Sequence, residues 1–442
     1  MSPADGAGPG PVAGSGRPDS LPHLDILGHD VYERSVPHAA YDEFRSKAPV
    51  AWVNETEANG HDGSGFWSLT THADVVAVHK DWRTFSSEVG GTELEELQHD
   101  PEALAARRTM LETDPPRHTK MRQLVNPTFS RVSVQTYAEH ATHLMGQVLD
   151  DAIATSASAG SVDGVHALAR ELPIRMITGL LGVPDDDAPQ LFHWADQIVY
   201  NADPDYSPAV SDQTDTDPYR LLPFRSPVSA KVFEYVQRLA AARRGTDTGD
   251  VLGVLTNALV DGEPLTEREQ GTFFLLLLIA GNETTRHALA QGLLALAEHP
   301  DVLPRLRAEP GLLDSATEEV LRWTCPQVHF RRTATVDTEI RGVTIAAGDK
   351  IVTWYLAANF DPAEFDRSHE FDITRTPNRH VTFGGGGPHL CLGQWMARLE
   401  VRTFLQAMSE RVERVELTGD PRRVRSNFIN GLKALPLTFE PR

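Results

Sequence analysis

A run of four glycines leads into Cys391, one of the two cysteines of the chain. Glycine is used where a backbone turns sharply or closely approaches another group. A phosphate-binding loop of the type GxxxxGKS or GxxxxGKT would need a lysine after the glycines, but the stretch TFGGGGPHLCLGQ continues with Pro388 and His389. The absence of that lysine therefore argues against a phosphate-binding loop.

The thiol of Cys391 has two interpretations. A helix is expected to begin near Leu392, and a thiolate at such a position gains from the helix dipole and from free backbone N–H groups. Both effects lower the thiol pKa and favour a metal ligand, and the glycines would let the loop pass flat against a planar ligand. The alternative is a buried structural cysteine beside a glycine turn.

Two pairs of charged residues have helical spacing. Glu319 and Arg322 in EEVLR are three apart, and His118 and Arg122 in HTKMR are four apart, so each pair shares one helix face. The first pair alone could be an ordinary surface ion pair of small energetic value. Two cations on one face repel each other unless an anion lies between them, so the second pair indicates an anion site if the face is buried.

An acid and a hydroxyl interrupt the most apolar segment, FFLLLLIAGNETT, at Glu283 and Thr284. Buried polar groups are costly unless they have partners, which favours a functional role. The alternative is structural, with Thr284 donating to a carbonyl of its own helix.

The elements that must position these residues are mostly helical. Residues 1–20 are rich in Gly, Pro, Ala and Ser and are expected to be a disordered tail, and 21–442 is expected to form one domain. Strand-like segments are short and scattered, which predicts a helix-rich body with a minor sheet. The predicted helices are 100–111, 133–156, 186–200, 227–243, 266–299 and 395–413, and the predicted strands lie within 48–53, 65–70, 338–355 and 434–440.

Charge and cysteine content exclude several classes of protein. A net charge of -21 excludes general binding of nucleic acid, which needs a basic surface. Two cysteines cannot form a disulfide framework, which indicates a reducing compartment. The sequence contains neither a signal peptide nor a run of about 18 apolar residues, so we expect a cytoplasmic protein without a membrane span.

The loop FGGGGPHLCLG resembles the haem-binding loop of the cytochromes P450. The resemblance implies haem b as cofactor, with the Cys391 thiolate as the iron ligand. It also implies that Phe383, Gly387, His389 and Gly393 form the haem-binding loop. Phe383 stands eight residues before the cysteine, whereas seven is usual in the family. One glycine is thus additional, and the residue that shields the sulfur stays open.

The other motifs occur in the order found in that family and span residues 118 to 393. By resemblance, Glu283 and Thr284 relay protons to the reacting oxygen. Glu319 and Arg322 are joined by Arg375 of FDITR in a cluster that braces the Cys loop. The residues implied to bind haem from outside the loop are His118, Arg122, Ala280 and Arg332.

The resemblance implies a mostly α cytochrome P450 fold with a minor β-sheet region and haem between the central helix and the helix after the Cys loop. It further implies a monooxygenase that uses O2 and two electrons. A peroxygenase of the same fold is less consistent with the acid and hydroxyl pair. A non-catalytic haem-binding sensor would have no use for that pair.

Electrons must be supplied by a partner, since two cysteines cannot hold an iron–sulfur cluster. The resemblance implies a ferredoxin with its NAD(P)H-dependent reductase. Ferredoxins are typically acidic and would dock on a basic patch. The candidate residues are Lys120, Arg122, Arg398 and Arg402, and the alternative is that they form ordinary surface pairs with Glu400 or aspartates.

The expected substrate is a sizeable hydrophobic small molecule. Phrases such as FSSEVGGT resemble the actinobacterial subgroup that hydroxylates methyl-branched lipids, steroids and terpenoids. Tailoring enzymes, which hydroxylate or epoxidise polyketide or diterpenoid scaffolds, share these phrases. The acidic segment 201–229 is expected to form a lid, and the alternative is a disordered loop. The residues expected to line the pocket are Ile279, Val328, Phe330, Phe428 and Ile429.

Overall fold

The computed structural model describes residues 17, 19–55, 65–207 and 209–442. Most of the tail expected at 1–20 lies outside these described residues. The α-helices are α1 (His29–Arg34), α2 (His38–Lys47), α3 (His72–Lys80), α4 (Pro101–Arg107), α5 (Arg117–Val125), α6 (Arg131–Gln135), α7 (Ala138–Ala159), α8 (Glu171–Leu181), α9 (Ala188–Val199), α10 (Val228–Arg243), α11 (Val251–Asn257), α12 (Glu267–Glu298), α13 (Val302–Ala308), α14 (Leu313–Thr324), α15 (Tyr355–Ala358) and α16 (Gln394–Arg411). Short helical turns of other types are η2 (Val165–Ala169), η3 (Asp185–Asp187), η4 (Asp217–Tyr219), η5 (Pro223–Arg225) and η6 (Pro310–Leu312).

The strands form one five-stranded sheet and several small ones. The large sheet has the order β1-β2-β10-β7-β3, in which only the β2–β10 pair is parallel. A three-stranded sheet has the order β11-β14-β4. The strands are β1 (Val50–Val53), β2 (Phe66–Leu69), β3 (Phe85–Ser86), β4 (Val162–Asp163), β5 (Leu259–Val260), β6 (Glu263–Pro264), β7 (His329–Ala334), β8 (Thr338–Ile340), β9 (Val343–Ile345), β10 (Lys350–Trp354), β11 (Val412–Leu417), β12 (Arg422–Arg423), β13 (Leu432–Ala434) and β14 (Pro436–Pro441).

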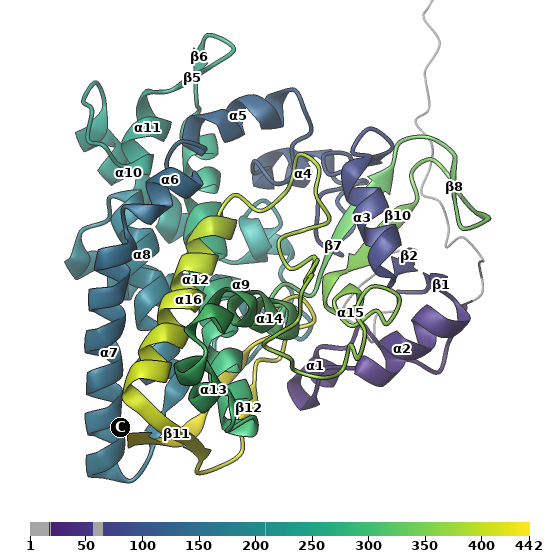
Figure 1. Ribbon diagram of the computed structural model, residues 1–442. Helices are drawn as coiled ribbons and strands as arrows, with labels where there is room; N and C mark the ends of the chain where they lie inside the picture. The colour runs from purple at the N-terminus through teal and green to yellow at the C-terminus, as the bar shows by residue number, and fades with distance from the viewer. Residues whose placement is uncertain (1–16, 18, 56–64, 208) are drawn as a thin grey trace, which may run out of the picture.

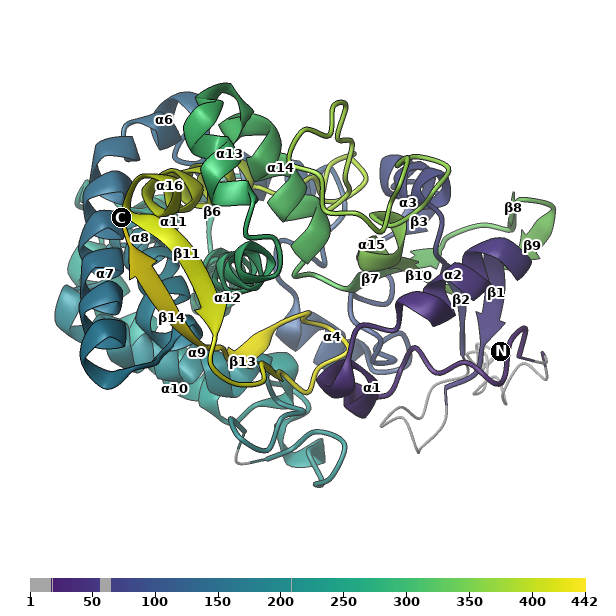
Figure 2. The same ribbon diagram turned by 60° about the horizontal axis from the view of Figure 1, so that its bottom comes forward.

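Helices and sheet occupy different sides of the molecule. In Figures 1 and 2, helices α7, α8, α10, α12 and α16 lie on one side, and the large sheet lies on the other beside α2 and α3. The C-terminus ends beside α7 and α16 in both views. The helix-rich body with a minor sheet predicted from the sequence is therefore confirmed.

α12 is the central helix of the helical side. Its first turn has a capping box, because the Thr266 side chain accepts from the Glu269 N–H while the Glu269 carboxylate accepts from the Thr266 N–H. Most side chains from Gln270 to Ile279 are buried on all sides of the helix. Such a helix must be surrounded by others. α12 packs against α8, α10, α14 and α16, and Figure 2 shows it almost end on in their midst.

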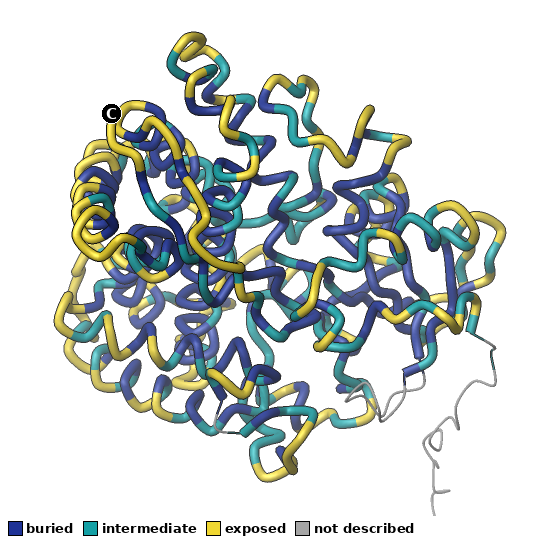
Figure 3. Tube along the Cα trace, turned by 90° about the horizontal axis from the view of Figure 1, so that it is seen from below, coloured by how far each residue is buried: buried dark blue, intermediate teal, exposed yellow. Residues whose placement is uncertain are grey.

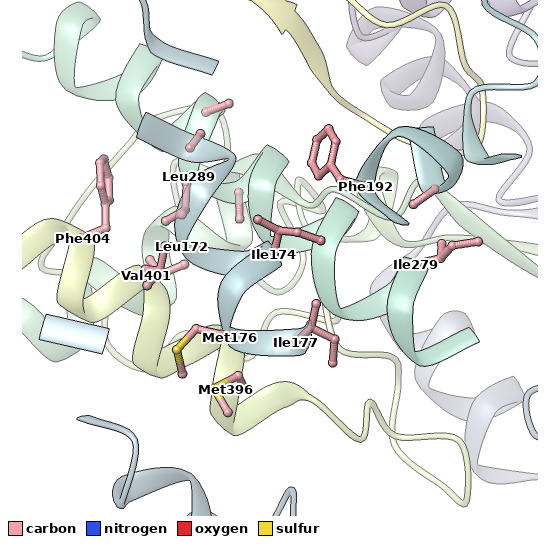
Figure 4. Close-up of a cluster of buried hydrophobic side chains, with 14 of the residues drawn as sticks. Leu172, Ile174, Met176, Ile177, Phe192, Ile279, Leu289, Met396, Val401 and Phe404 are labelled. Carbon is pink, nitrogen blue, oxygen red and sulfur yellow. The ribbon is translucent and has the colours of Figure 1, made fainter. Parts of the chain in front are cut away.

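The packing between α8, α12 and α16 is close. A Cβ on Gly281 of α12 would lie 2.7 Å from Cδ1 of Ile177 on α8, so glycine permits the approach of the two helices. Figure 4 shows Met176 of α8 pointing toward Met396 of α16. These contacts hold α12 and α16 in fixed relative positions.

Alternation along β7 places two predicted site residues on one face of the sheet. Phe330 pairs with Thr353 and Arg332 pairs with Ile351 of β10. Residues two apart in a strand point to the same face, so Phe330 and Arg332 point together. Both line a cavity that also contains Cys391.

Burial follows the interior of both sides of the molecule, as Figure 3 shows in dark blue. Trp354, Tyr41 and Phe66 are fully buried behind the sheet, and Phe273 and Phe274 are fully buried in α12. Among the described helices, none combines the length and the apolar composition that crossing a membrane would require.

One predicted helix is shorter than expected. Residues 100–111 were expected to be helical, but α4 ends at Arg107 and Arg108 is extended. Side chains satisfy the backbone beyond this point: the Thr109 N–H donates to Glu112 Oε2 at 3.0 Å, and Thr113 Oγ1 donates to the Thr109 carbonyl at 2.8 Å. Such local bonds compete with helix hydrogen bonds and end the helix early.

Candidate functional site

The glycines before Cys391 are required by contact with α3. Gly387 has φ +72°, and a Cβ there would lie 2.2 Å from the His79 carbonyl oxygen. A Cβ on Gly385 would lie 2.8 Å from Cα of Val76. The sequence argument attributed the glycines to a planar ligand, whereas the close approach that these two allow is to the backbone of α3.

Cys391 is held by the loop and by the helix that follows. Its N–H donates to the Phe383 carbonyl at 2.9 Å, and α16 begins three residues later with Gly393 as its N-cap. Arg398 lies over the Phe383 ring at 4.4 Å. The backbone of Phe383 thus contacts the backbone of Cys391 despite the additional glycine.

Burial dominates the acidity of the Cys391 thiol. It raises the thiol pKa, and the N–H of Gly393 and the charges of Arg122 and Arg398 oppose the rise. The sequence argument expected a lowered pKa from the helix start. That expectation is wrong for the protein alone because desolvation outweighs the nearby donors and cations.

Two histidines from distant segments stack beside the loop. The rings of His118 and His389 lie 4.2 Å apart. His118 Nδ1 and His389 Nε2 are buried, and neither has a hydrogen-bond partner among the described residues. Unpaired buried nitrogens are costly and indicate a missing partner.

Two arginines next to these histidines have no acidic partner in the described chain. Neither Arg122 nor Arg332 forms an ion pair there with a carboxylate, although Arg332 is only 2% exposed. Arg122 Nη1 donates to the Pro388 carbonyl at 3.4 Å, and Arg332 Nη1 donates to the carbonyl of the preceding residue at 2.6 Å. Burial is the main reason that the pKa of His118 is lowered to about 4, and the charges of these two arginines lower it further. A group with two carboxylates, such as haem with its propionates, fits this cluster.

The structure brings Glu319, Arg322 and Arg375 together in one cluster. Glu319 and Arg322 are fully buried, and Arg322 donates to both carboxylate oxygens at 2.8 Å. Arg375 Nε donates to Glu319 Oε2 at 3.1 Å. Arg322 also donates to the carbonyl of Asn359, whose side-chain amide donates to Thr382 Oγ1 at the start of the Cys loop. The cluster is therefore tied to the loop through Asn359.

Thr284 and Glu283 of α12 both line a distal cavity described below, but only Thr284 also lines the cavity that contains Cys391. Thr284 is half-buried, lines the cavity that contains Cys391, and donates to the Ala280 carbonyl at 2.7 Å. Glu283 is fully buried and forms an ion pair with Arg286 at 2.6 Å. Burial raises the pKa of Glu283, while Arg286 opposes the rise. Tyr200 of the segment after α9 also donates to Glu283.

An inner cavity of about 210 Å³ brings most of the predicted haem-binding residues together. Thr284 on α12 and Cys391 before α16 both line this inner cavity. Gly387 does not line it and instead contacts α3. The predicted residues that line the inner cavity are His118, Arg122, Ala280, Thr284, Phe330, Arg332, Phe383, His389, Cys391 and Gly393.

A smaller distal cavity of about 110 Å³ adjoins the inner cavity, because Leu111, Leu276, Ala280, Thr284, Gln327 and Phe330 line both. Four of the residues expected around a substrate line the distal cavity: Ile279, Phe330, Phe428 and Ile429. Val328 lines neither cavity and is fully buried in the core behind the sheet. Val328 precedes β7 and lies outside the strand, so the alternation that directs Phe330 into both cavities does not extend to it, and the expectation for Val328 is wrong.

The expected lid, 201–229, connects α9 and α10 and contains η4 and η5. Several of its residues line a mouth cavity of about 500 Å³, including Asp212 and Phe224. Ion pairs attach the segment to the C-terminal region: Asp212 with Arg425 at 2.7 Å, and Asp203 with Lys433 at 3.1 Å.

The predicted basic docking residues are largely neutralised. Arg122 lies in the inner cavity, where it lacks a carboxylate partner. Glu400 was considered as a partner of the arginines, but it is buried, and burial raises its pKa. The partners are other acids: Lys120 pairs with Asp261, Arg398 with Glu318 at 2.7 Å, and Arg402 with Asp314 at 2.9 Å.

Sequence reasoning missed the polar residues that surround the two cavities. Tyr200 and Arg286 hold Glu283, and Glu93 and Arg107 line the distal cavity. Arg286 is three residues after Glu283, so helical spacing could have found it. The others come from separate segments with no local motif, and only the fold brings them together.

Comparison with known proteins agrees with this geometry. A family model described as Cytochrome P450 matches residues 71–421. The Mycobacterium tuberculosis Steroid C26-monooxygenase is 34% identical, covering 94% of this chain and 92% of the relative. The Methyl-branched lipid omega-hydroxylase of the same organism is 35% identical, covering 96% of each chain.

A solved structure agrees as well. A Mycobacterium marinum cytochrome P450 in complex with pseudoionone is 33% identical, with a TM-score of 0.85, covering 96% of this chain and all of that chain. The family match spans most of the chain, and the relatives exceed 30% identity over nearly all of it. The thiol, the cation cluster and the central helix lie around one cavity. The chain therefore belongs to the cytochrome P450 family, as a haem-binding monooxygenase of its bacterial branch.

Proposed function

We propose that this monooxygenase hydroxylates a sizeable hydrophobic substrate of the steroid, terpenoid or branched-lipid class with electrons from a ferredoxin. The proposal rests on one observation. The inner cavity, which is lined by Cys391, adjoins a mostly apolar distal cavity. Relatives named for steroid and branched-lipid oxidation and for a pseudoionone complex support the same substrate classes.

The chemistry that haem supplies when bound is the insertion of one oxygen atom of O2 into a C–H bond, with two electrons and two protons consumed and water released. Cys391 is the residue that would bind the iron. His118, Arg122, Arg332 and His389 would hold the propionates, since they offer cations and unpaired nitrogens.

Thr284 and Glu283 would deliver protons. The Thr284 hydroxyl faces the inner cavity while it donates to the Ala280 carbonyl, so its oxygen is free to accept a further hydrogen bond. Burial favours the protonated form of Glu283, and Tyr200 and Arg286 hold its carboxyl in place. A proton held at Glu283 would then reach the cavity beside Thr284.

The cysteine content of the chain supports a separate protein as the electron donor. Its two cysteines are unpaired, and the described residues contain no group of three or more His, Cys, Asp or Glu side chains that could hold a metal ion. The chain thus offers no set of four cysteines for an iron–sulfur cluster, and a separate ferredoxin is the simplest source of electrons. The same unpaired thiols support a reducing compartment, and we propose the cytoplasm.

The thiolate assignment is tested by the carbon monoxide difference spectrum of the dithionite-reduced holoprotein. We expect a band at about 450 nm for the wild type and for the matched control Cys325→Ala, and its loss in Cys391→Ala. A band at about 450 nm in Cys391→Ala would contradict the assignment.

The substrate class is tested by titrating the holoprotein with steroids, acyclic terpenoids and methyl-branched fatty acids while the Soret band is monitored. Turnover under dioxygen labelled with oxygen-18, with a ferredoxin and reductase present, should place about one labelled oxygen atom in each product molecule. Binding without product in the presence of a competent electron donor would favour the haem sensor. Turnover only of polyketide or diterpenoid scaffolds would favour the tailoring enzyme.

A further inference from the structure

The three cavities follow one another through shared residues. Ala280 and Thr284 line both the inner and the distal cavity. Glu93 and Phe224 line both the distal and the mouth cavity. The distal cavity thus has Thr284 where it adjoins the inner cavity and Glu93 where it adjoins the mouth cavity.

Glu93 is unusual among the acids of the distal cavity. Glu112 accepts from Thr92 Oγ1 at 2.7 Å and from the Thr109 N–H at 3.0 Å, and Glu283 is held by Arg286. Glu93 has no hydrogen-bond donor among the described residues, and its side chain is 30% exposed toward the cavities that it lines.

Arg107 is the cation next to Glu93 and is only 7% exposed. Its Nη2 pairs with Glu95 at 2.6 Å and lies 3.8 Å from Glu93 Oε2, which is too long for a hydrogen bond. Its Nη1 is buried without a hydrogen-bond partner among the described residues. In the distal cavity, a carboxylate that lacks a donor, Glu93, thus lies beside the guanidinium of Arg107.

Burial raises the pKa of Glu93 to about 7; Arg107 opposes the rise, and Glu95 and Glu112 add to it. A carboxylate in this position is therefore costly without a donor. A ligand that supplies one would recover that cost on binding.

The chemistry of the pair selects one ligand group. A carboxylate would be repelled by Glu93 and Glu95. An ammonium group would be repelled by Arg107 and could not accept a hydrogen bond from it. A ketone could accept from Arg107 but could not donate to ionised Glu93. A hydroxyl group donates to Glu93 and accepts from Arg107 at the same time.

We propose that Glu93 and Arg107 form a recognition subsite for a hydroxyl group at the end of the substrate remote from the carbon that is oxidised. This inference rests on the proposed function, and it narrows the substrate to apolar alcohols. The hydroxyl fixes the depth of the ligand, so that the opposite end lies beside Thr284.

The test compares alcohols with their methyl ethers, which keep an acceptor and lose the donor. Cholestanol, its methyl ether and cholestane form one series, and farnesol, its methyl ether and farnesane form another. Dissociation constants are measured from the Soret shift of the holoprotein. In at least one series we expect the alcohol to bind about tenfold tighter than the ether.

Variants locate the effect. Glu93→Leu should abolish the preference for the alcohol, and Glu93→Gln, which keeps an acceptor oxygen, should reduce it. Asp217→Asn is the matched control, because Asp217 also lines the mouth cavity and its side chain is 76% exposed. It should keep the full preference.

Equal binding of alcohol and ether by the wild type in both series would overturn the inference, as would a preference that survives in Glu93→Leu. Absence of any spectral response in either series, with a normal carbon monoxide band, would also overturn it. In these cases the proposed monooxygenase stands. A missing carbon monoxide band would instead contradict the proposed function itself.

Discussion

At the residue scale, Glu319 depends on its partners more than any surface acid does. It is fully buried, and its carboxylate accepts from Arg322, Arg375, the Asn378 side chain and the Asp372 N–H. Removing one charge from a buried ion pair leaves the other uncompensated.

We expect Glu319→Gln to lower the free energy of unfolding by about 3 kcal/mol or more. Asp314→Asn is the control, because Asp314 is 84% exposed in its pair with Arg402 and should cost no more than about 1 kcal/mol. Urea unfolding of both variants, followed by circular dichroism, measures the difference. Equal midpoints for the two variants would show that the buried cluster does not stabilise the fold.

Tyr200 provides a second prediction at this scale. Its hydroxyl donates to Glu283 and thereby lowers the pKa of that carboxyl against the larger effect of burial. Tyr200→Phe removes this donor, so the pKa of Glu283 should rise further. If protonated Glu283 supplies the proton, the fall of turnover at high pH should move to higher pH.

The measurement is the pH profile of product formation for wild type, Tyr200→Phe and the control Tyr206→Phe. The Tyr206 ring lies 4.8 Å from that of Tyr200, and the described structure gives its hydroxyl no hydrogen bond to Glu283. The control profile should match the wild type. A shift to lower pH in Tyr200→Phe would contradict the assigned role of Glu283.

At the element scale, the Cys loop and α3 must fit against each other. Gly387→Ala would place a Cβ 2.2 Å from the His79 carbonyl, at φ +72°. Backbone atoms cannot move aside as a flexible side chain can, so the loop must shift and Cys391 with it.

We expect Gly387→Ala to lose most of the haem during purification, measured as the ratio of Soret to protein absorbance. Gly311→Ala is the matched control, since nothing lies within 4 Å of a Cβ at that position. It should retain wild-type haem content. Normal haem content in Gly387→Ala would show that the contact with α3 does not set the loop.

Elements also show how far the sequence predicts structure. The long segments with a clear helical pattern, 266–299 and 227–243, form α12 and α10 within a few residues of the predicted ends. The end of α4 was not predictable from periodicity, because the side chains of Glu112 and Thr113 take over the hydrogen bonds of the Thr109 backbone. Val328 failed as a pocket residue because it lies just before β7 and packs into a hydrophobic core, which the pattern of its own segment does not show.

At the scale of the whole molecule, a net charge of -21 repels an acidic ferredoxin. The proposed docking therefore depends on local cations, and both candidate arginines of α16, Arg398 and Arg402, are already paired with acids. Arg402 is 47% exposed and Asp314 is 84% exposed, so the partner would compete with Asp314 for Arg402.

At low salt we expect Arg402→Gln to slow reduction of the haem iron by an acidic ferredoxin about fivefold. Asp314→Asn should accelerate it by a similar factor. A factor of about five corresponds to about 1 kcal/mol of charge interaction. Stopped-flow reduction under carbon monoxide measures the rates. Asp420→Asn, beyond the C-terminal end of α16, makes the same change in net charge and should have little effect. Equal acceleration by both aspartate variants would indicate global charge rather than a docking site.

The sequence by itself determined the family, the cysteine that would bind haem, and the pairs His118 with Arg122 and Glu319 with Arg322. These features depend on spacing along one segment, and spacing is a local property of the chain. Only the tertiary structure decided which groups meet across segments. It brought Tyr200 to Glu283, pressed the glycines against α3, and placed Glu93 beside Arg107 in the distal cavity. Burial likewise depends on the whole fold, and it reversed the pKa shift expected for Cys391.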